Sequence, residues 1–551
     1  MHQILVALAV LLTVAPGCEK DEQPPQLTFV SHSDSETIWN TETLQVDVTD
    51  NVGVVKVEFF VNGSPLGTVA APPWEIELNT RSYEDGTIAV SARAYDEEGN
   101  ASDDATLNLV VENTLLTVTV EEGYLWEDED QVYELQAVIY LTSDDGEPLG
   151  WAIMENGDTK VFKRPEGFNE KHFDLGRGFF YTRADDPLYL SGTLYTYMDM
   201  QPASMVYRYD DEPSATGEYV GSCSFTAEDI NQEDPYTLSH SGYEAYGSIH
   251  DDSAWVDLYE HSNQAYFYLK QGASGYYNFY SGLEPDNHYL IRSGDLSSNM
   301  TPFYIDYYTQ SFRYLRTSVY GYATPGDYNA LDETLLYQDS YSEGENTRIA
   351  FHYPTGLDAV KDFFFYAWMD VTDYISYAVY QAGPLPSSIP NMSGLIHGVW
   401  LDLPDQVQAN VTGSADMQRC ALQIDEENRS ISLRIRGPMG APIRIPPIPA
   451  QVEAAFEFPA ITDENIRYYY HELLEHSDVD GYYPLASHLS FMNPIDPYYS
   501  QGTVVRYTEY FDYPGDQKAA CRVNNRAGDR KSLVDGPGFQ GPPSGPSAVS
   551  R

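Results

Sequence analysis

The stretch 468–481, "YYYHELLEHSDVDG", is the part of the sequence that comes nearest to metal chemistry. A zinc-protease helix carries two histidines four residues apart, with a glutamate after the first, so that both imidazoles face one metal. His471 and Glu472 begin this pattern. The next histidine is His476, which on a helix would point about 140° away from the first. We therefore predict that residues 471–481 bind no zinc.

Motifs for other common catalytic mechanisms are absent from the sequence. It contains no Gly-x-Ser-x-Gly elbow, no Walker loop and no Gly-x-Gly-x-x-Gly turn opening a helix. We therefore expect a binding protein rather than an enzyme, with no cofactor other than calcium. The carboxylate pair of a glycosidase leaves no local motif. The alternative is therefore a hydrolase that acts on polysaccharide or peptide through residues 215–515.

Aromatic residues are the candidate ligand-binding groups. The sequence has 46 Tyr, 22 Phe and 7 Trp. Exposed rings on strands can stack on sugar rings, and Trp255, Trp368 and Trp400 are the candidates for such contacts. The alternative role for each is packing in a core.

The charge of the chain restricts its partners. There are 84 Asp and Glu against 30 Lys and Arg, a formal net charge of −54. Such a charge repels phosphate groups, which argues against nucleic acid as a partner. An acidic surface suits a protein that stays soluble outside the cell, or one that binds calcium through carboxylates.

Residues 26–112 have the pattern of a small β-sandwich. Apolar residues alternate along Leu44–Val48, Val55–Val61 and Ile88–Ala94. Asn62-Gly63 is typical of a tight hairpin turn. About seven short strands in this length predict two packed sheets.

The same residues resemble the bacterial immunoglobulin-like (Ig-like) domains of surface and secreted proteins. The resemblance rests on "DNVGVVKVEFFVNGSPLGTV", "PPWEIELNT", "DGTIAVSARAYDEEGN" and "LNLVV". It implies a spacer or adhesive module rather than a catalytic one.

Two loops of this predicted sandwich carry oxygen-rich side chains at what should be one end. They contain Asp50, Asn51, Asp96 and Asn100. Carboxylate and amide oxygens are calcium ligands, so these residues form a candidate calcium site. Formation of turns is the alternative role.

The rest of the chain is also predicted to form β-structure. Strand and turn patterns predict a β-sandwich at 115–211, a Tyr-rich β domain at 215–385 and a further β domain at 393–515, the last two being one unit or two. Gly, Pro and Ser dominate the segment 516–551, which predicts a disordered tail. We expect an all-β, multidomain fold: an N-terminal Ig-like sandwich followed by antiparallel, sandwich-type domains.

The N-terminus predicts export. Residues 4–14, "ILVALAVLLTV", have the length of a signal-peptide apolar core and are too short to span a bilayer. Residues 1–17 resemble a bacterial lipoprotein signal, which implies that Cys18 is lipidated and begins an anchor and linker at 18–25. Lys20, Asp21 and Glu22 resemble the surface-export signal of Bacteroidota lipoproteins.

These features together predict a lipid-anchored protein exposed on the outer membrane, with secretion as the alternative location. Its partners are expected to be the membrane, through the lipid, and an extracellular glycan or protein ligand. An Ig-like spacer would present a β-rich region for glycan or surface-ligand capture, or for adhesion.

Overall fold

A computed structural model describes residues 21–477 and 502–510 of the chain. Within the first range the undescribed positions are 126–132, 184, 187, 208–217, 241, 242, 252, 261, 307–311, 324, 326–333, 343–347, 372–374, 390–394, 403–405, 414, 446, 463 and 464. The expected signal peptide, Cys18, Lys20 and the 516–551 tail thus lie outside the described residues. Among the helices of the described part, none is long and apolar enough to cross a membrane.

The chain divides into two compact units. The first consists of Met1–Leu115 with Lys163–Asn169, and the second of Leu116–Phe162 with Glu170–Arg551. Each is described by itself below.

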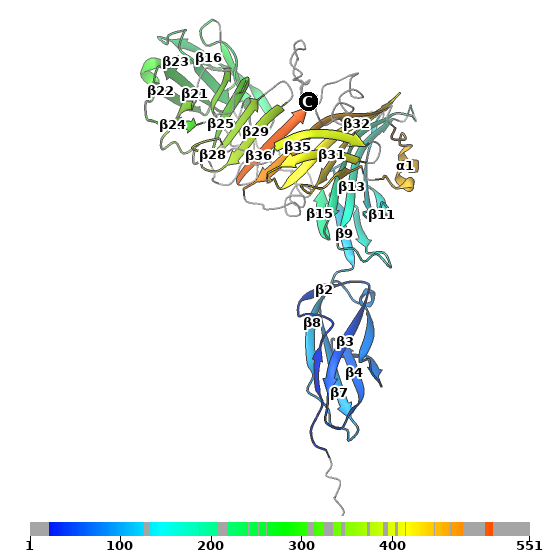
Figure 1. The fold of residues 1–551 in the computed structure, drawn as a ribbon. Coiled ribbons are helices and arrows are strands. Elements are labelled where there is room, and N and C mark those ends of the chain that lie inside the picture. Colours follow the sequence, from blue (N-terminus) through cyan, green and yellow to red (C-terminus); the bar gives the residue numbers. More distant parts are fainter. Residues whose placement is uncertain are drawn as a thin grey trace, which may run out of the picture. The chain divides into compact units, whose positions relative to one another are not determined.

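The first unit is a β-sandwich (Figure 1). One sheet has the order β1-β3-β6 and the other β2-β8-β7-β4-β5. The strands are β1 (Gln26–Phe29), β2 (Glu36–Ile38), β3 (Thr41–Thr49), β4 (Val54–Val61), β5 (Ser64–Val69), β6 (Glu75–Asn79), β7 (Gly86–Asp96) and β8 (Ala105–Val111), with a 3-10 turn η1 (Thr80–Ser82).

The expected alternation creates the core of this sandwich. Val57 and Phe59 of β4 and Val90 of β7 are buried between the sheets, while the residues between them face outward. The hairpin turn after β4 has positive φ at both Asn62 (49°) and Gly63 (77°), as a tight two-residue turn requires. The Ig-like sandwich predicted from the sequence is confirmed.

The second unit is organised around a 12-stranded sheet of order β11-β10-β13-β14-β33-β32-β35-β36-β29-β28-β25-β26. Its strands, in that order, are β11 (Pro148–Met154), β10 (Tyr133–Thr142), β13 (Phe173–Arg183), β14 (Leu190–Met200), β33 (Arg429–Gly437), β32 (Met417–Glu426), β35 (Ile466–His476), β36 (Gly502–Tyr510), β29 (Ile375–Ala382), β28 (Asp362–Asp370), β25 (Tyr314–Tyr322) and β26 (Thr334–Ser342).

This sheet differs from the domain division expected from the sequence. The ranges 115–211, 215–385 and 393–515 each contribute strands to it, so they do not form separate sheets. Strand β14 pairs in parallel with β33, for example Leu194 with Leu433. Such pairing joins segments that are distant in the sequence, and strand and turn patterns carry no information about it.

Glycines allow one face of the sheet to pack closely. Gly176 of β13 lies opposite Tyr140 of β10, and a Cβ atom at Gly176 would overlap the Tyr140 ring. Gly178 leaves room for the Phe180 ring in the same way. Phe180 in turn packs on Phe456, with 5.1 Å between ring centroids. Phe456 belongs to α1 (Ala450–Phe456), the α-helix of the described residues.

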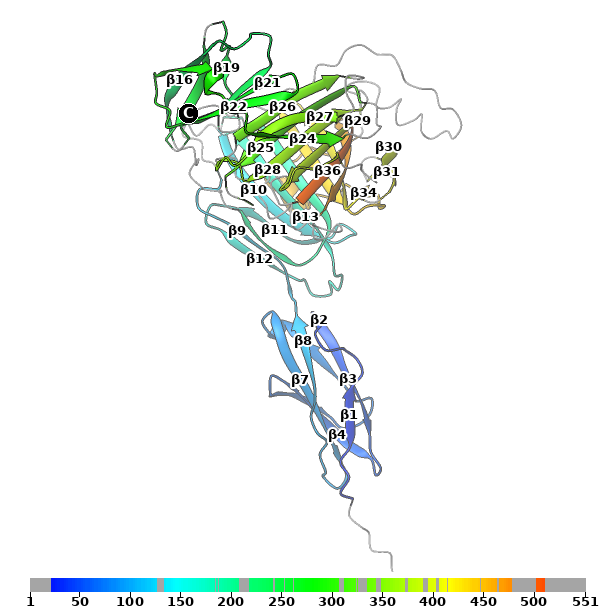
Figure 2. The ribbon, with the colours of Figure 1, turned by 90° about the vertical axis from the view of Figure 1, so that its left-hand side faces the viewer.

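The second unit also contains an eight-stranded sandwich, here called the 219–292 sandwich, which is visible at the top of Figure 2. Its sheets are β19-β20-β16-β23 and β18-β17-β21-β22. The strands are β16 (Tyr219–Glu228), β17 (Tyr236–His240), β18 (Tyr243–Glu244), β19 (Tyr246–Gly247), β20 (Ala254–Tyr259), β21 (Gln264–Gln271), β22 (Ser274–Ser281) and β23 (His288–Arg292). Phe225, Val256, Leu258 and Phe267 are among the residues buried between the sheets.

Smaller sheets complete the second unit. Their strand orders are β12-β9-β15, β24-β27 and β30-β31-β34. The strands are β9 (Thr114–Val120), β12 (Thr159–Lys163), β15 (Ala203–Tyr207), β24 (Met300–Asp306), β27 (Arg348–Pro354), β30 (Leu395–Asp402), β31 (Gln406–Thr412) and β34 (Ile443–Arg444), with a 3-10 turn η2 (Ser293–Asp295). The all-β, multidomain fold predicted from the sequence is confirmed.

Candidate functional site

Strand β20 of the 219–292 sandwich separates an apolar face from an aromatic and polar one. Ala254, Val256 and Leu258 are buried in the core of the sandwich. The residues between them, Trp255, Asp257 and Tyr259, point to the opposite side because successive strand residues alternate in direction. Trp255 is 41% exposed. The outer side of this sheet is therefore open to solvent.

Four residues form a row across the outer side. Tyr246 of β19 is paired with Trp255 of β20, Trp255 with Ser224 of β16, and Ser224 with His288 of β23. Tyr246 is 52% exposed. Directly paired residues of neighbouring strands are close enough for their side chains to touch, so the row brings two aromatic rings next to a hydroxyl and an imidazole.

Hydrogen bonds fix the polar part of this row. The Ser224 hydroxyl lies 2.9 Å from Nδ1 of His288, and the Thr226 hydroxyl lies 3.0 Å from Nε2 of the same ring. On the other side of the row, the Tyr246 hydroxyl donates to Oδ1 of Asp257 at 3.4 Å. These contacts hold the side chains in place before any ligand arrives.

A second aromatic pair lies further along β20. Tyr259 is paired with Tyr219 of β16, and their rings meet edge to face with 5.9 Å between centroids. Tyr219 is 57% exposed, and its hydroxyl lies 3.2 Å from Oγ of Ser222. Ser222 is paired with Asp257, which places both polar residues between the two aromatic pairs.

We call this surface the aromatic face. It comprises Tyr219, Ser222, Ser224, Thr226, Tyr246, Trp255, Asp257, Tyr259 and His288. Its rings offer flat apolar area, and its hydroxyl and carboxylate groups can donate or accept hydrogen bonds. Such a surface is chemically suited to binding.

Of the three tryptophans expected to bind ligand, the structure places only Trp255 on this face. Trp368 lies on β28 of the 12-stranded sheet, where it is half-buried and its Nε1 donates to Oδ1 of Asp370 at 2.8 Å. Trp400 lies on β30, and its side chain is outside the described residues.

The expected calcium ligands Asp50, Asp96 and Asn100 are engaged in turn contacts. Oδ2 of Asp50 accepts from the backbone N–H groups of Val52 and Gly53, each at 2.9 Å. Asp96 accepts both from the backbone N–H of Asn100 and from its side-chain amide, each at 2.7 Å.

A different set of carboxylates converges beside these turns. Oxygen atoms of Asp21, Asp96 and Glu98 lie within 4.8 Å of one another. Asp21 also accepts from the side-chain amide of Asn51 at 3.1 Å. Calcium binding at this end of the first unit stays a prediction.

The stretch around His471 forms a strand, not a helix. His471 lies on β35, fully buried, with Nδ1 3.1 Å from the Tyr468 hydroxyl and Nε2 3.1 Å from the Gln418 side chain. Burial lowers the pKa of His471 to about 4. Residues an odd number apart on a strand face opposite sides, so His471 and His476 do not form the two-histidine face of a zinc protease. The prediction that this stretch binds no zinc stands untested.

Three carboxylates of the second unit surround an arginine. Arg444 lies 3.2 Å from Asp144, 3.3 Å from Asp174 and 3.6 Å from Asp199. Burial raises the pKa of Asp174 to about 7, although Arg444 opposes this shift. Burial, and then the neighbouring Asp144, raise the pKa of Asp199 as well. Because the guanidinium already contacts all three carboxylates, it occupies the place of a metal ion.

Buried arginines gather on the face of the 12-stranded sheet opposite to Gly176. Arg177 and Arg436 are 1% and 7% exposed, and both lie over the Tyr195 and Tyr197 rings at 4.8–5.5 Å. Burial lowers the pKa of Arg436, and nearby Arg419 and Arg177 lower it further.

A carboxylate lies beside these arginines. Arg436 is paired with Arg419, and Arg419 with Glu472, with which it forms an ion pair. The Arg419 side chain is 11% exposed and that of Glu472 is 4% exposed. This group of charges is held inside the protein, in contrast to the open aromatic face.

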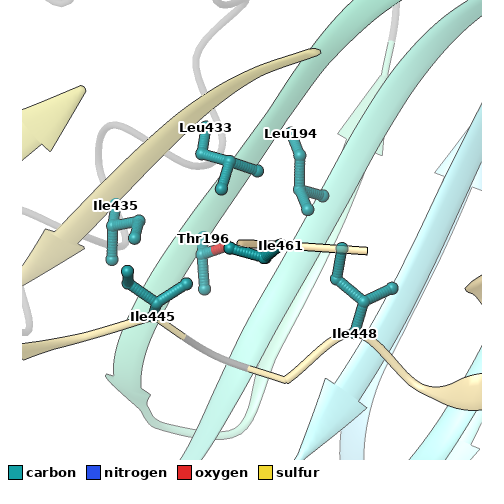
Figure 3. A pocket seen from close by; sticks show the side chains of 7 residues that line it. All are labelled: Leu194, Thr196, Leu433, Ile435, Ile445, Ile448 and Ile461. Carbon is teal, nitrogen blue, oxygen red and sulfur yellow. The ribbon is translucent and has the colours of Figure 1, made fainter. Parts of the chain in front are cut away.

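An apolar gap lies between β14, β33 and the segment 445–461 (Figure 3). It is lined by Leu194, Thr196, Leu433, Ile435, Ile445, Ile448 and Ile461. Its empty space is about 200 Å³ including open solvent, and it is too narrow to hold a water-sized sphere. With a single hydroxyl and no charged group in its lining, it is a packing gap and not a binding site.

The match to a known family lies within the first unit. Residues 25–92 match the family model of the bacterial Ig domain. The chain is thus an all-β, multidomain protein with an N-terminal bacterial Ig-like domain. No curated protein matches the sequence.

Solved structures show only a limited likeness. Fibronectin(III)-like modules of Clostridium thermocellum CbhA are 19% identical over 16% of this chain and 96% of theirs, with a TM-score of 0.14. An endo-beta-1,4-mannanase from Thermotoga petrophila is 16% identical over 17% of this chain and 21% of its own, also with a TM-score of 0.14. The BSP domain of a biofilm associated protein is 12% identical over 30% of this chain and 27% of its own, with a TM-score of 0.12. TM-scores this low carry no argument about function.

Proposed function

We propose that this protein is a cell-surface lipoprotein that binds an extracellular glycan through the aromatic face of the 219–292 sandwich. The observation that supports this most is the row of Tyr246, Trp255, Ser224 and His288 across four paired strands. Rings that are about half-exposed keep apolar area in contact with water, which a ligand can cover.

A glycan matches the chemistry of this surface. The C–H face of a sugar ring is apolar and flat, so it stacks on Trp and Tyr rings, while its hydroxyl groups need hydrogen-bond partners around the ring. Ser222 and Asp257 provide such partners next to the aromatic rings, and Ser224 and Thr226 hold the two nitrogens of the His288 ring beside them. The rings lose little rotamer entropy on binding because each has only two χ angles.

The remaining parts of the chain support capture at a surface. In this proposal a lipid on Cys18 attaches the chain to the outer membrane, and the Ig-like unit acts as a spacer. Confinement to one surface raises the effective concentration of weak sites. We therefore expect millimolar to micromolar affinity, or about 4–8 kcal/mol per site.

The central test is Trp255→Ala. We expect this variant to weaken binding of soluble polysaccharides at least tenfold, about 1.4 kcal/mol, because it removes the largest exposed ring of the aromatic face. Affinity gel electrophoresis of the full-length ectodomain against a panel of polysaccharides measures the effect. Trp151→Ala is the matched control, since Trp151 is 37% exposed on β11, outside this face.

Equal binding by wild type and Trp255→Ala would contradict the assignment of the site. Release of reducing sugars or peptides during the assay, abolished by a single carboxylate substitution, would favour the hydrolase instead. Absence of binding to any polysaccharide, with capture of a protein through the same face, would favour adhesion.

The proposed anchor is tested separately. We expect metabolic labelling with palmitate to mark the wild type and not Cys18→Ala, and the variant to leave the membrane fraction, because a thioether-linked lipid requires the cysteine thiol. Protease added to intact cells should remove the wild-type protein if it faces the medium. Protection from protease in intact cells would contradict surface exposure.

A further inference from the structure

The aromatic face has two stacking platforms rather than one. The first platform is Tyr246 with Trp255, and the second is Tyr219 with Tyr259. Trp255 and Tyr259 are four residues apart on the same strand, and at 3.2–3.4 Å per residue their Cα atoms are about 13 Å apart. This distance is longer than one sugar ring, so a single sugar cannot stack on both platforms.

Polar groups occupy the space between the platforms. Asp257 is half-buried there, opposite Ser222, and each of these two residues is hydrogen-bonded to a tyrosine of a different platform. A ligand that covers both platforms must therefore be apolar at its two ends and hydroxylated in the middle. A chain of linked sugars meets this requirement, because every unit has both apolar faces and hydroxyl edges.

The same arrangement is less suited to a protein partner. The core of a protein–protein interface is apolar and depleted in charged residues. Here the carboxylate of Asp257 and the hydroxyl group of Ser222 lie at the centre, between the two aromatic pairs.

The charges around the aromatic face argue against an acidic glycan. Glu218 and Glu260 are exposed at the end of the sheet near the second platform, and the half-buried Asp257 adds a third carboxylate to this face. Arg292 at the other end pairs with Glu228 at 2.9 Å. The whole chain carries a formal net charge of −54. Uronate or sulfate groups would be repelled by these carboxylates.

We infer that the ligand is an extended, neutral polysaccharide that runs along β20 and stacks on both platforms, with Asp257 contacting hydroxyl groups between them. This inference rests on the proposed glycan-binding function and adds the ligand's charge, its minimum length and its direction. Binding then depends on chain length, because a disaccharide reaches one platform and a longer oligosaccharide reaches both.

The first experiment uses the full-length ectodomain and soluble polysaccharides. The neutral probes are galactomannan, xyloglucan, arabinoxylan and mixed-linkage β-glucan, and the acidic probes are alginate, polygalacturonate and heparin. We expect retardation by at least one neutral polysaccharide and by no acidic one. Binding of acidic polysaccharides alone, lost in Trp255→Ala, would overturn this inference and leave glycan binding intact. Binding of no polysaccharide would overturn both.

The second experiment titrates oligosaccharides of the bound neutral polysaccharide, from two to six sugar units, by calorimetry. We expect affinity to rise at least tenfold from the disaccharide to the hexasaccharide. Tyr219→Ala should lower hexasaccharide affinity about tenfold and leave disaccharide affinity within about twofold. Tyr304→Ala is the matched control, because Tyr304 is 52% exposed on β24, outside the aromatic face, against 57% for Tyr219.

Either of two results would contradict the two-platform arrangement. One is equal affinity for all oligosaccharide lengths. The other is unchanged hexasaccharide binding in Tyr219→Ala. In both cases a loss of binding in Trp255→Ala would still support a glycan site at the first platform, so failure of this inference is distinguishable from failure of the proposed function.

Discussion

Glu472→Gln is expected to lower the free energy of unfolding of the second unit by about 3–5 kcal/mol. The substitution keeps the size of the side chain and removes the negative charge that pairs with Arg419. Arg419 is nearly buried, and its neighbours Arg436 and Arg177 are buried cations as well. A buried charge without its counter-charge costs much more than the pair contributes.

Scanning calorimetry of the full-length chain measures this effect. The matched control is Asp104→Asn, which breaks the exposed ion pair with Arg93, where the two side chains are 43% and 41% exposed. Exposed pairs contribute about 0–1 kcal/mol, so the control should hardly change stability. Loss of less than about 1 kcal/mol in Glu472→Gln would show that other groups neutralise the arginines.

Gly176→Val is expected to destabilise the 12-stranded sheet by about 1–3 kcal/mol or more. Even a single Cβ atom at this position would overlap the Tyr140 ring, which is 1% exposed. The ring must leave its rotamer or the strands must separate, and either change disturbs a closely packed core. Urea unfolding followed by tryptophan fluorescence measures the loss.

Two further variants test the cause. Gly294→Ala serves as the control, because a Cβ at Gly294 meets nothing within 4 Å and φ there needs no glycine. In the double variant Tyr140→Ala with Gly176→Val, the smaller side chain should make the valine less costly than in the wild-type background. Equal costs of the valine in both backgrounds would contradict overlap with the ring as the cause.

Local sequence patterns were sufficient to predict the first unit. The strands of the Ig-like sandwich are short, alternate regularly and are joined by turns such as Asn62-Gly63. Most of their pairings are between neighbours or near neighbours in the chain, and the pairing of β2 with β8 is the exception. In the second unit the strands could be recognised, but their partners could not. Leu190 pairs with Arg429, and Ile375 with Glu509, and no local pattern records such a choice.

Local sequence patterns also predicted one part of the candidate site and missed another part that depends on strand pairing. Trp255 alternates with Ala254 and Val256, so the sequence itself carried a signal that the tryptophan faces outward. Tyr246 and His288 had no such signal, since their relevance comes only from pairing of β19 and β23 with the neighbouring strands. Trp368 follows a run of aromatic residues without clear alternation, which is why its half-buried position was not predictable.

The position of β36 has a consequence for the order of folding. This strand is the last along the described chain, yet it lies inside the sheet, between β35 and β29. It pairs with both neighbours over most of its length. Until it is in place, two parts of the sheet, β11 to β35 and β29 to β26, each present an unpaired edge. Sheets closed by contacts between distant residues fold slowly, and open edges invite pairing with other chains. The second unit therefore reaches its protected state only after Gly502–Tyr510 is available to pair, whereas the Ig-like sandwich of β1 to β8 contains no strand of this sheet and does not depend on it.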